Sequence, residues 1–179
     1  QGSITLQSSG ERALPFSVGG TLNLFASSIR QAGTLRAPLG TIRIGWDGTG
    51  AAPVDLITGA AVPVTEQLIL APGSVTSISA VDPTSGNSLV LPYGLSVNGT
   101  AWIDPTGFDI TASGPPSKSI VLAGREIRSE RGSVVDLRGG ADLFAYRWVP
   151  GNGGSRDLLQ EKGRFAILPG YGFDYAPYA

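Results

Sequence analysis

The sequence predicts an all-β fold, a β-solenoid with coils of about 20 residues. One glycine-turn phrase opens three short segments inside residues 20–44, which read GTLNL, GTLRA and GTIRI. In each segment apolar and polar residues alternate, as they do in a strand with one buried face. Gly2, Gly20 and Gly40 lie 18 and 20 residues apart, and short strands with glycine turns at such a spacing are typical of coiled repeat folds.

The composition supports one domain and excludes several classes of partner. The 179 residues include 26 Gly, 13 Pro and 41% hydrophobic residues, which is enough for a single core. The net charge is −1, so no overall field favours nucleic acid or an anionic membrane. No apolar run reaches the roughly 18 residues of a membrane span, and we expect no membrane insertion.

Cysteine, histidine and methionine are all absent. Without cysteine there is neither a disulfide framework nor a thiolate metal site. A chain without easily oxidised side chains suits an extracellular location. We expect no cofactor and no metal.

Residues 1–46 are predicted to form about two coils. The alternation places one set of apolar side chains inside, namely Ile4, Leu6, Leu22, Leu24, Ile29, Leu35, Ile42 and Ile44. The polar residues between them are expected to face water, and they include Thr5, Asn23, Arg36 and Arg43. Arg36 and Arg43 are alternatively a site for an anion, although solvated strand faces are the simpler interpretation.

Residues 47–118 are predicted to leave the stacked coils as a loop and a β-hairpin excursion. Pro53 and Pro63 cannot donate to a strand ladder. Further strands are expected within 68–110, and Asn98-Gly99 between two short apolar strands is the strongest hairpin signal in the chain.

The coils are predicted to resume over 119–149, where Ser119 begins a new apolar segment and GSVV at 132–135 repeats the earlier phrase. Residues 150–179 are expected to form an aromatic-rich C-terminal covering loop, with a short helical turn near 157–162. Because the chain begins within a strand phrase, we interpret 1–179 as a single segment of a longer protein.

Several phrases together resemble one protein family. They are TLRAPLGTIRIG at 34–45, LAPGSVTSISA at 70–80, LPYG and VNGTAW within 91–102, VVDLRGGADLFAYRWVPGNGGSRDLL at 134–159, and FAILPGYGFDYAPY at 165–178. The chain is similar in these phrases to the filamentous haemagglutinin-like large exoproteins of Gram-negative bacteria. The resemblance implies a right-handed parallel β-helix and covers nearly the whole chain.

The same resemblance implies a function and a location. Members of that family are secreted to the bacterial cell surface by an outer-membrane transporter in two-partner secretion, and they act as adhesins or stalks. The expected role is therefore a structural or adhesive segment of a secreted filament, without chemistry. The partners implied are that transporter during export and a host or cell-surface glycan or protein.

A carbohydrate-binding or polysaccharide-cleaving β-helix is the alternative. Glycoside hydrolysis needs two carboxyl groups held about 5 to 10 Å apart, and the candidate pairs are Asp136 with Asp142 and Asp104 with Asp109. Asp104 precedes a proline in a turn, where Asp commonly bonds its own backbone, and Asp136 shares a strand with Arg138. We therefore expect structural roles for both pairs, and no catalytic residue.

The aromatic residues near the C-terminus are the candidate ligand platform. Exposed rings can bind sugars or anchor a protein partner, and the candidates are Tyr146, Trp148, Tyr171 and Tyr175. The competing interpretation is that this C-terminal segment packs over the side of the stacked coils as a lid. The glycine-aspartate loops at 139–142 and 151–157 resemble calcium loops, but each occurs once, and a turn is the simpler interpretation.

Overall fold

The structure, a computed structural model, describes residues 2–10, 13–55, 57–97, 99–115, 117–147 and 162–163. Thirteen strands and no helix are found within these ranges, so the predicted all-β class is confirmed. The same ranges accordingly contain no apolar helix long enough to cross a membrane.

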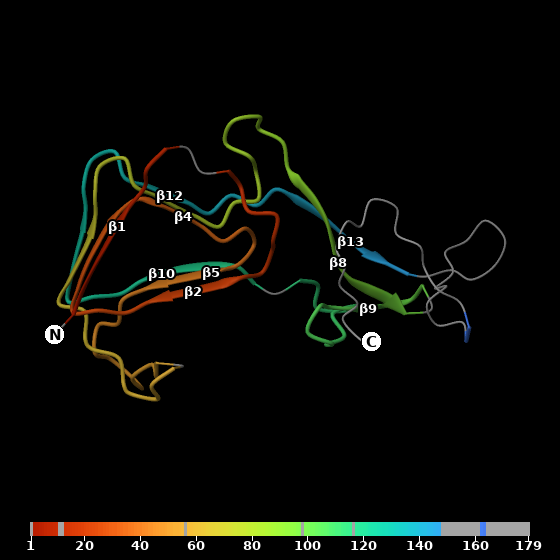
Figure 1. The fold of residues 1–179 in the computed structure, drawn as a ribbon, viewed down its shortest axis with the longest axis horizontal. Helices are drawn as coiled ribbons and strands as arrows, with labels where there is room; N and C mark the ends of the chain where they lie inside the picture. Colours follow the sequence, from red (N-terminus) through yellow and green to blue (C-terminus); the bar gives the residue numbers. More distant parts are fainter. Residues whose placement is uncertain are drawn as a thin grey trace.

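Three parallel sheets form the body of the protein (Figure 1). The first contains β1 (Ser3–Gln7), β3 (Ser28–Ala32), β6 (Gln67–Leu70) and β11 (Glu126–Ser129), in that order. The second has the order β10 (Ser119–Leu122), β5 (Thr41–Ile44) and β2 (Thr21–Leu24). The third has the order β12 (Val134–Asp136), β7 (Val75–Ser77) and β4 (Thr34–Arg36).

The chain passes through these sheets in a fixed order. It runs through β2, β3 and β4, then β5, β6 and β7, and finally β10, β11 and β12. Each strand therefore lies beside one from an earlier or later pass, and β5 pairs with β10 although 78 residues separate Thr41 from Ser119. Neighbouring strands are in register and parallel, so equivalent side chains point to the same side.

The core lies between the three sheets and is built from rows of equivalent side chains. One row joins Leu22, Ile42 and Ile120 across the second sheet, and these residues share the main hydrophobic cluster, as the sequence predicts. In the first sheet Ile29 lies beside Leu68, and both are almost completely buried. The buried apolar rows hold the sheets together.

A buried glutamine forms hydrogen bonds with the backbone at the turn between the first and third sheets. Gln31, at 0% exposure, is the penultimate residue of β3, shortly before the start of β4. Its side-chain Nε2 donates to the carbonyl oxygens of Gly33 and Val75, and its Oε1 accepts from the N–H of Gly33. The amide thus replaces water for backbone groups that would otherwise be buried without partners.

The glycine phrases occupy different sheets, which corrects the predicted spacing. The phrases at Gly20 and Gly40 do stack, because Thr21 pairs with Thr41. The phrase at Gly2 does not join them: its strand β1 pairs with β3, and Ile4 lies beside Ile29. The interval of 18 residues between Gly2 and Gly20 is therefore not a coil length. Alternation shows which side of a strand is buried, but it does not show which sheet the strand joins.

The excursion predicted for 47–118 is narrower in the structure. Strands β6 and β7 fall in this range, yet they pair with β3 and β4 inside the body. Leu68 and Leu70 are at most 2% exposed, and their burial holds the segment in place. The chain leaves the body twice, between β5 and β6 and again between β7 and β10.

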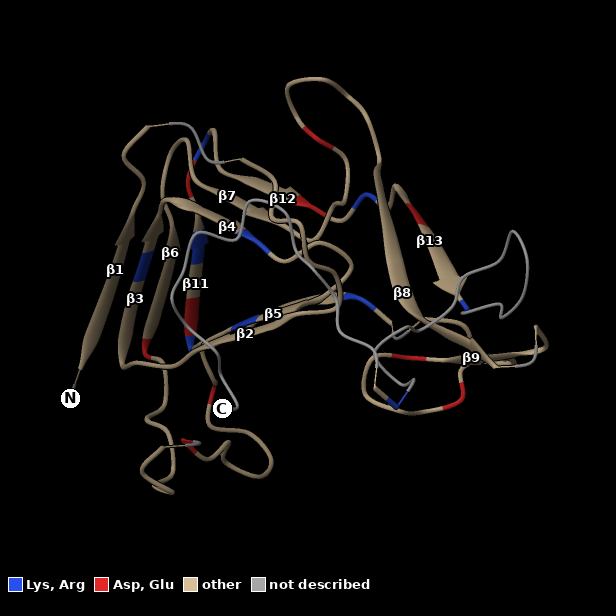
Figure 2. Cartoon of the chain, turned by 45° about the vertical axis from the view of Figure 1, so that its right-hand side comes forward, with Lys and Arg blue, Asp and Glu red and all other residues tan. Residues whose placement is uncertain are grey.

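A fourth sheet lies to one side of the body (Figure 2). Strands β8 (Leu89–Val97) and β9 (Ala101–Ile103) form the antiparallel hairpin that the sequence predicts around position 98, with Val97 opposite Ala101. Strand β13 (Ala141–Tyr146) pairs in parallel with β8. This strand was predicted to belong to the coils over 119–149, and the structure places it in the fourth sheet instead.

Exposed charged residues occur along the first sheet, and Figure 2 shows their positions in β3 and β11. Arg128 pairs with Glu126 at 2.9 Å, and Arg30 lies 3.7 Å from Glu130. Such exposed pairs contribute roughly 1 kcal/mol or less each. The apolar rows therefore dominate the stability of the body.

The C-terminal predictions lie almost wholly outside the described residues. They are the covering loop over 150–179 and the helical turn near 157–162. Only residues 162–163 of these ranges are described.

Candidate functional site

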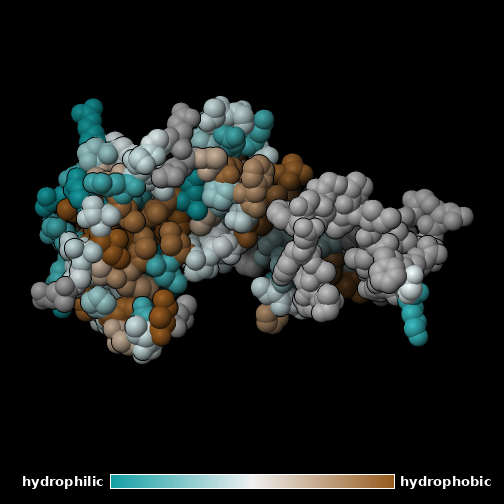
Figure 3. Space-filling model, in the orientation of Figure 1, coloured by the Kyte–Doolittle hydropathy of each residue, from teal (hydrophilic) through white to brown (hydrophobic). Residues whose placement is uncertain are grey.

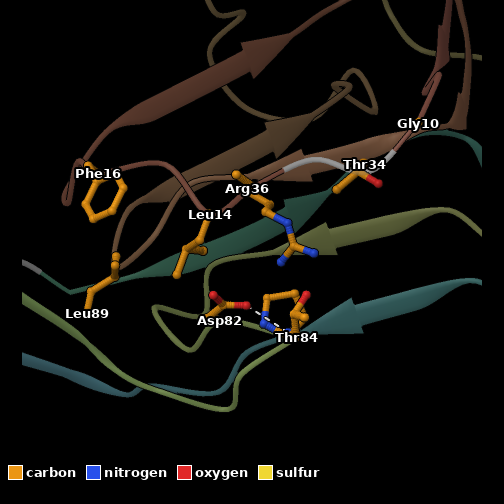
Figure 4. Close-up of a pocket in the computed structure, with 10 residues that line it drawn as sticks. Gly10, Leu14, Phe16, Thr34, Arg36, Asp82, Thr84 and Leu89 are labelled. Carbon is orange, nitrogen blue, oxygen red and sulfur yellow. Dashed lines mark hydrogen bonds between the residues drawn. The ribbon is translucent and has the colours of Figure 1, made fainter.

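An open groove of about 670 Å³ lies beside the third sheet, and we call it the Arg36 groove. Its walls come from four places in the chain: Gly10 with residues 13–16, strand β4, the turn at 82–84, and Leu89 at the start of β8. Figure 4 shows the side chains of these walls around one hollow. A volume of this size is within the range of small-molecule sites.

The groove exists because the chain between β1 and β2 leaves the strand ladder. Strand β4 is the edge strand of its sheet, and the N–H of Thr34 donates to the Oγ of Ser8 rather than to another strand. Further along the chain, Leu14 packs against Ala80 and Leu89 in a second apolar cluster. The hollow lies between residues 13–16 on one side and β4 on the other.

Arg36 forms the polar side of the groove. Its side chain is half-buried, which differs from the fully solvated strand face that the sequence predicts. The Nε atom is buried, and it has no hydrogen-bond partner among the described residues. In Figure 4 the guanidinium group points toward Asp82 and Thr84. Burying an N–H without a hydrogen-bond partner is costly, so this N–H is available to a ligand that could accept from it.

Asp82 lies opposite Arg36 and caps its own turn. Its Oδ1 accepts from the N–H of Thr84 at 2.8 Å and from the N–H of Ser85 at 3.3 Å. The Thr84 and Ser85 hydrogen bonds hold the pKa of Asp82 below its ordinary value, and the positive charge of Arg36 acts in the same direction. Asp82 is therefore an anion at neutral pH, and it balances Arg36 within the groove.

The other end of the groove is apolar. Leu14 and Leu89 are buried, whereas the ring of Phe16 is 86% exposed. The groove therefore combines an aromatic ring at one end with hydrogen-bond donors and acceptors at the other (Figure 4).

The first predicted carboxylate pair, Asp104 with Asp109, is engaged in turns. The Oδ1 of Asp104 accepts from the N–H of Thr106, from its hydroxyl and from the N–H of Phe108. Asp109 accepts in the same way from the N–H and hydroxyl of Thr111. The threonine hydroxyls are the largest cause of the lowered pKa of both carboxyl groups. The predicted backbone bonding of Asp104 is confirmed.

The second predicted pair is divided between two sheets. Asp136 lies in β12, where Arg138 binds it through Nε and Nη2 at 3.0 Å each. The Arg138 side chain is the main cause of the lowered pKa of Asp136. Asp142 lies in β13 and is exposed. The structure thus gives Asp136 a structural partner, as its position beside Arg138 predicts.

Of the predicted aromatic platform, the structure describes Tyr146 alone. Its side chain is 45% exposed on the same side of β13 as Phe144, at 46%. Trp148, Tyr171 and Tyr175 lie outside the described residues. The ligand platform and the lid therefore both stay predictions.

The carboxylates are also possible ligands of a metal ion. Within the described ranges no group of three or more Asp and Glu side chains is placed to hold a metal ion.

The chain matches no protein-family model, and neither a curated protein nor a solved structure gives a significant match.

Proposed function

We propose that this chain is a segment of right-handed parallel β-helix from a secreted, cell-surface filament, and that it serves as a rigid stalk or in attachment without chemistry. The fixed order in which the chain passes through the three parallel sheets supports the fold, because each pass then corresponds to one coil.

The observation that carries the proposal is that the apolar rows continue onto the outermost described strands at both ends of the body. Strand β11 is an edge strand, and Ile127 at its centre continues the row of Ile29 and Leu68 while being 46% exposed. At the opposite edge, Figure 3 shows apolar residues gathered between β1, β2 and β4. Further coils on either side would cover these rows, as neighbouring units do in solenoid proteins.

The surface location and the export partner rest on the sequence resemblance. By that resemblance the parent protein would be a Gram-negative exoprotein, exported through an outer-membrane transporter of the two-partner type. On the cell surface it would meet a host or cell-surface glycan or protein.

The location is tested with antibodies raised against this segment and applied to intact cells of the source organism. The proposal predicts surface labelling that protease treatment of intact cells removes. Labelling that needs permeabilised cells and co-fractionates with a cytosolic control protein would contradict it.

The absence of chemistry is tested separately, by incubating the protein with common polysaccharides and measuring new reducing ends. We expect no release above that of a heat-denatured sample. Reproducible release that Asp136→Asn abolishes, while Asp104→Asn leaves it unchanged, would replace the stalk with a hydrolase centred on Asp136.

A further inference from the structure

We propose that the Arg36 groove binds a neutral saccharide of one or two sugar rings. The inference rests on the groove alone, and it holds whether or not the chain is part of a surface filament. It gives the groove a ligand class, whereas the sequence places candidate ligand residues only near the C-terminus.

The charges of the groove favour a neutral ligand that is rich in hydroxyl groups. The described lining holds one cation, Arg36, and one anion, Asp82, so neither sign of ligand charge is favoured. A guanidinium group supplies only donors, and a carboxylate supplies only acceptors. A sugar hydroxyl can both accept from the first and donate to the second, which a simple anion or cation cannot do.

The unused hydrogen-bonding capacity lies at the same end of the groove. A carboxylate can accept about four hydrogen bonds, and the turn N–H groups of Thr84 and Ser85 occupy two positions on Asp82. The hydroxyls of Thr34 and Thr84 also line this end. Hydrogen bonds that involve a charged group are about twice as strong as neutral ones, so this end can replace the water around a set of hydroxyls.

The apolar end supplies the second contact that a sugar ring needs. A pyranose carries C–H groups on one face and hydroxyls around its edge, and an exposed aromatic ring can pack against the C–H face. The ring of Phe16 is 86% exposed and lines the groove together with Leu14. A sugar bound in the groove would cover part of this exposed ring.

The test is a titration followed by two-dimensional ¹H–¹⁵N NMR of the whole chain. The probes are cellobiose, maltose, lactose and D-glucuronate, each added to roughly 20 mM, which covers millimolar dissociation constants. Because the Nε of Arg36 is shielded from water, its N–H signal reports directly on the groove. We expect at least one neutral disaccharide to shift this signal together with the amide signals of Thr34 and Thr84, saturably and with one dissociation constant.

Two variants, each with a matched control elsewhere on the surface, locate the binding. Phe16→Ala should weaken binding about three- to tenfold, the range for a lost aromatic contact, whereas Phe108→Ala, at a ring that is 72% exposed and outside the groove, should not. Arg36→Gln should weaken it about tenfold or more, and Arg43→Gln, on the outer face of β5, should leave it unchanged. Unchanged amide spectra away from the substituted site verify that each variant is folded.

Three results would overturn the inference. The first is the absence of any saturable shift in the groove signals with all three neutral disaccharides. The second is a response to D-glucuronate alone, which would make the groove an anion site. The third is a saturable shift that Phe16→Ala and Arg36→Gln leave intact, which would place the sugar elsewhere. None of these results bears on surface labelling, so failure here and failure of the proposed function are distinguishable.

Discussion

Truncation of Ile42 tests the stacked core directly. Ile42 is 0% exposed and lies between Leu22 and Ile120 in the second sheet. Ile42→Ala removes three carbon atoms, whose transfer to water costs roughly 2.4 kcal/mol at 0.8 kcal/mol for each group. The cavity left between two neighbouring strands adds to this, so the free energy of unfolding should fall by about 3 to 4 kcal/mol.

The same substitution at two other isoleucines supplies a graded series. Ile127, at 46% exposure on β11, has a neighbouring strand on one side only among the described residues, and Ile127→Ala should cost about half as much. Ile57 is 95% exposed in the loop between β5 and β6, and Ile57→Ala should change stability by no more than about 0.5 kcal/mol.

The assay is urea denaturation followed by far-ultraviolet circular dichroism, with an unchanged dependence on urea concentration as the sign that the unfolding reaction is the same. The order Ile42, Ile127, Ile57 is the expected result. A loss at Ile57 equal to that at Ile42, or a loss below about 1 kcal/mol at Ile42, would refute the stacked rows.

Three further predictions concern a close glycine contact, a buried glutamine and the carboxyl groups of the turns. Gly40→Ala should lower stability by about 2 kcal/mol or more, because a Cβ there would clash with the carbonyl oxygen of Gly20, whereas Gly20→Ala has open space and should change the midpoint of urea unfolding little. Gln31→Leu should lower the free energy of unfolding by about 1 to 3 kcal/mol in the same assay, because it leaves buried backbone groups without hydrogen-bond partners. An unchanged stability would contradict the hydrogen bonds described. The turn carboxyls, Asp104 among them, have pKa values below the ordinary 3.8 in the folded chain. The stabilisation that they give in their charged form is therefore fully present above the unfolded pKa and is lost as the pH falls through the folded pKa. The melting temperature should therefore drop below about pH 4, and Asp104→Asn should reduce that drop; a melting temperature that stays constant under acid would show that these bonds do not contribute.

Much of the body was predictable because strand alternation reports burial directly. It places Leu22, Ile42 and Ile44 inside, and all three lie in the main apolar cluster. The hairpin signal at Asn98-Gly99 is equally local, since it depends on two turn residues between short strands, and the observed pairing of Val97 with Ala101 agrees with it.

The parts that the sequence did not predict depend on contacts between distant residues. Proline and glycine mark where the chain leaves a ladder, but nothing local marks where it returns, and so β6 and β7 were included in the excursion. Arg36 presents the same difficulty. Alternation places it on the outer side of β4, but the hollow beside it arises only because residues 13–16 and 82–84, distant in the sequence, also line it.

Engineered disulfides provide the most direct measurement of strand order, because the natural chain has no cysteine. Val121 pairs with Arg43, and Arg43 separates it from Asn23. Neighbouring strands are about 4.8 Å apart, within the Cα separation of about 4.4 to 6.8 Å that a disulfide requires, whereas the next strand but one is about twice as far. Mild oxidation followed by mass spectrometry under non-reducing conditions should therefore show an intramolecular disulfide in the double variant R43C/V121C and free thiols in N23C/V121C. The reverse result, with N23C/V121C closed and R43C/V121C open, would mean that the strands do not stack in this order.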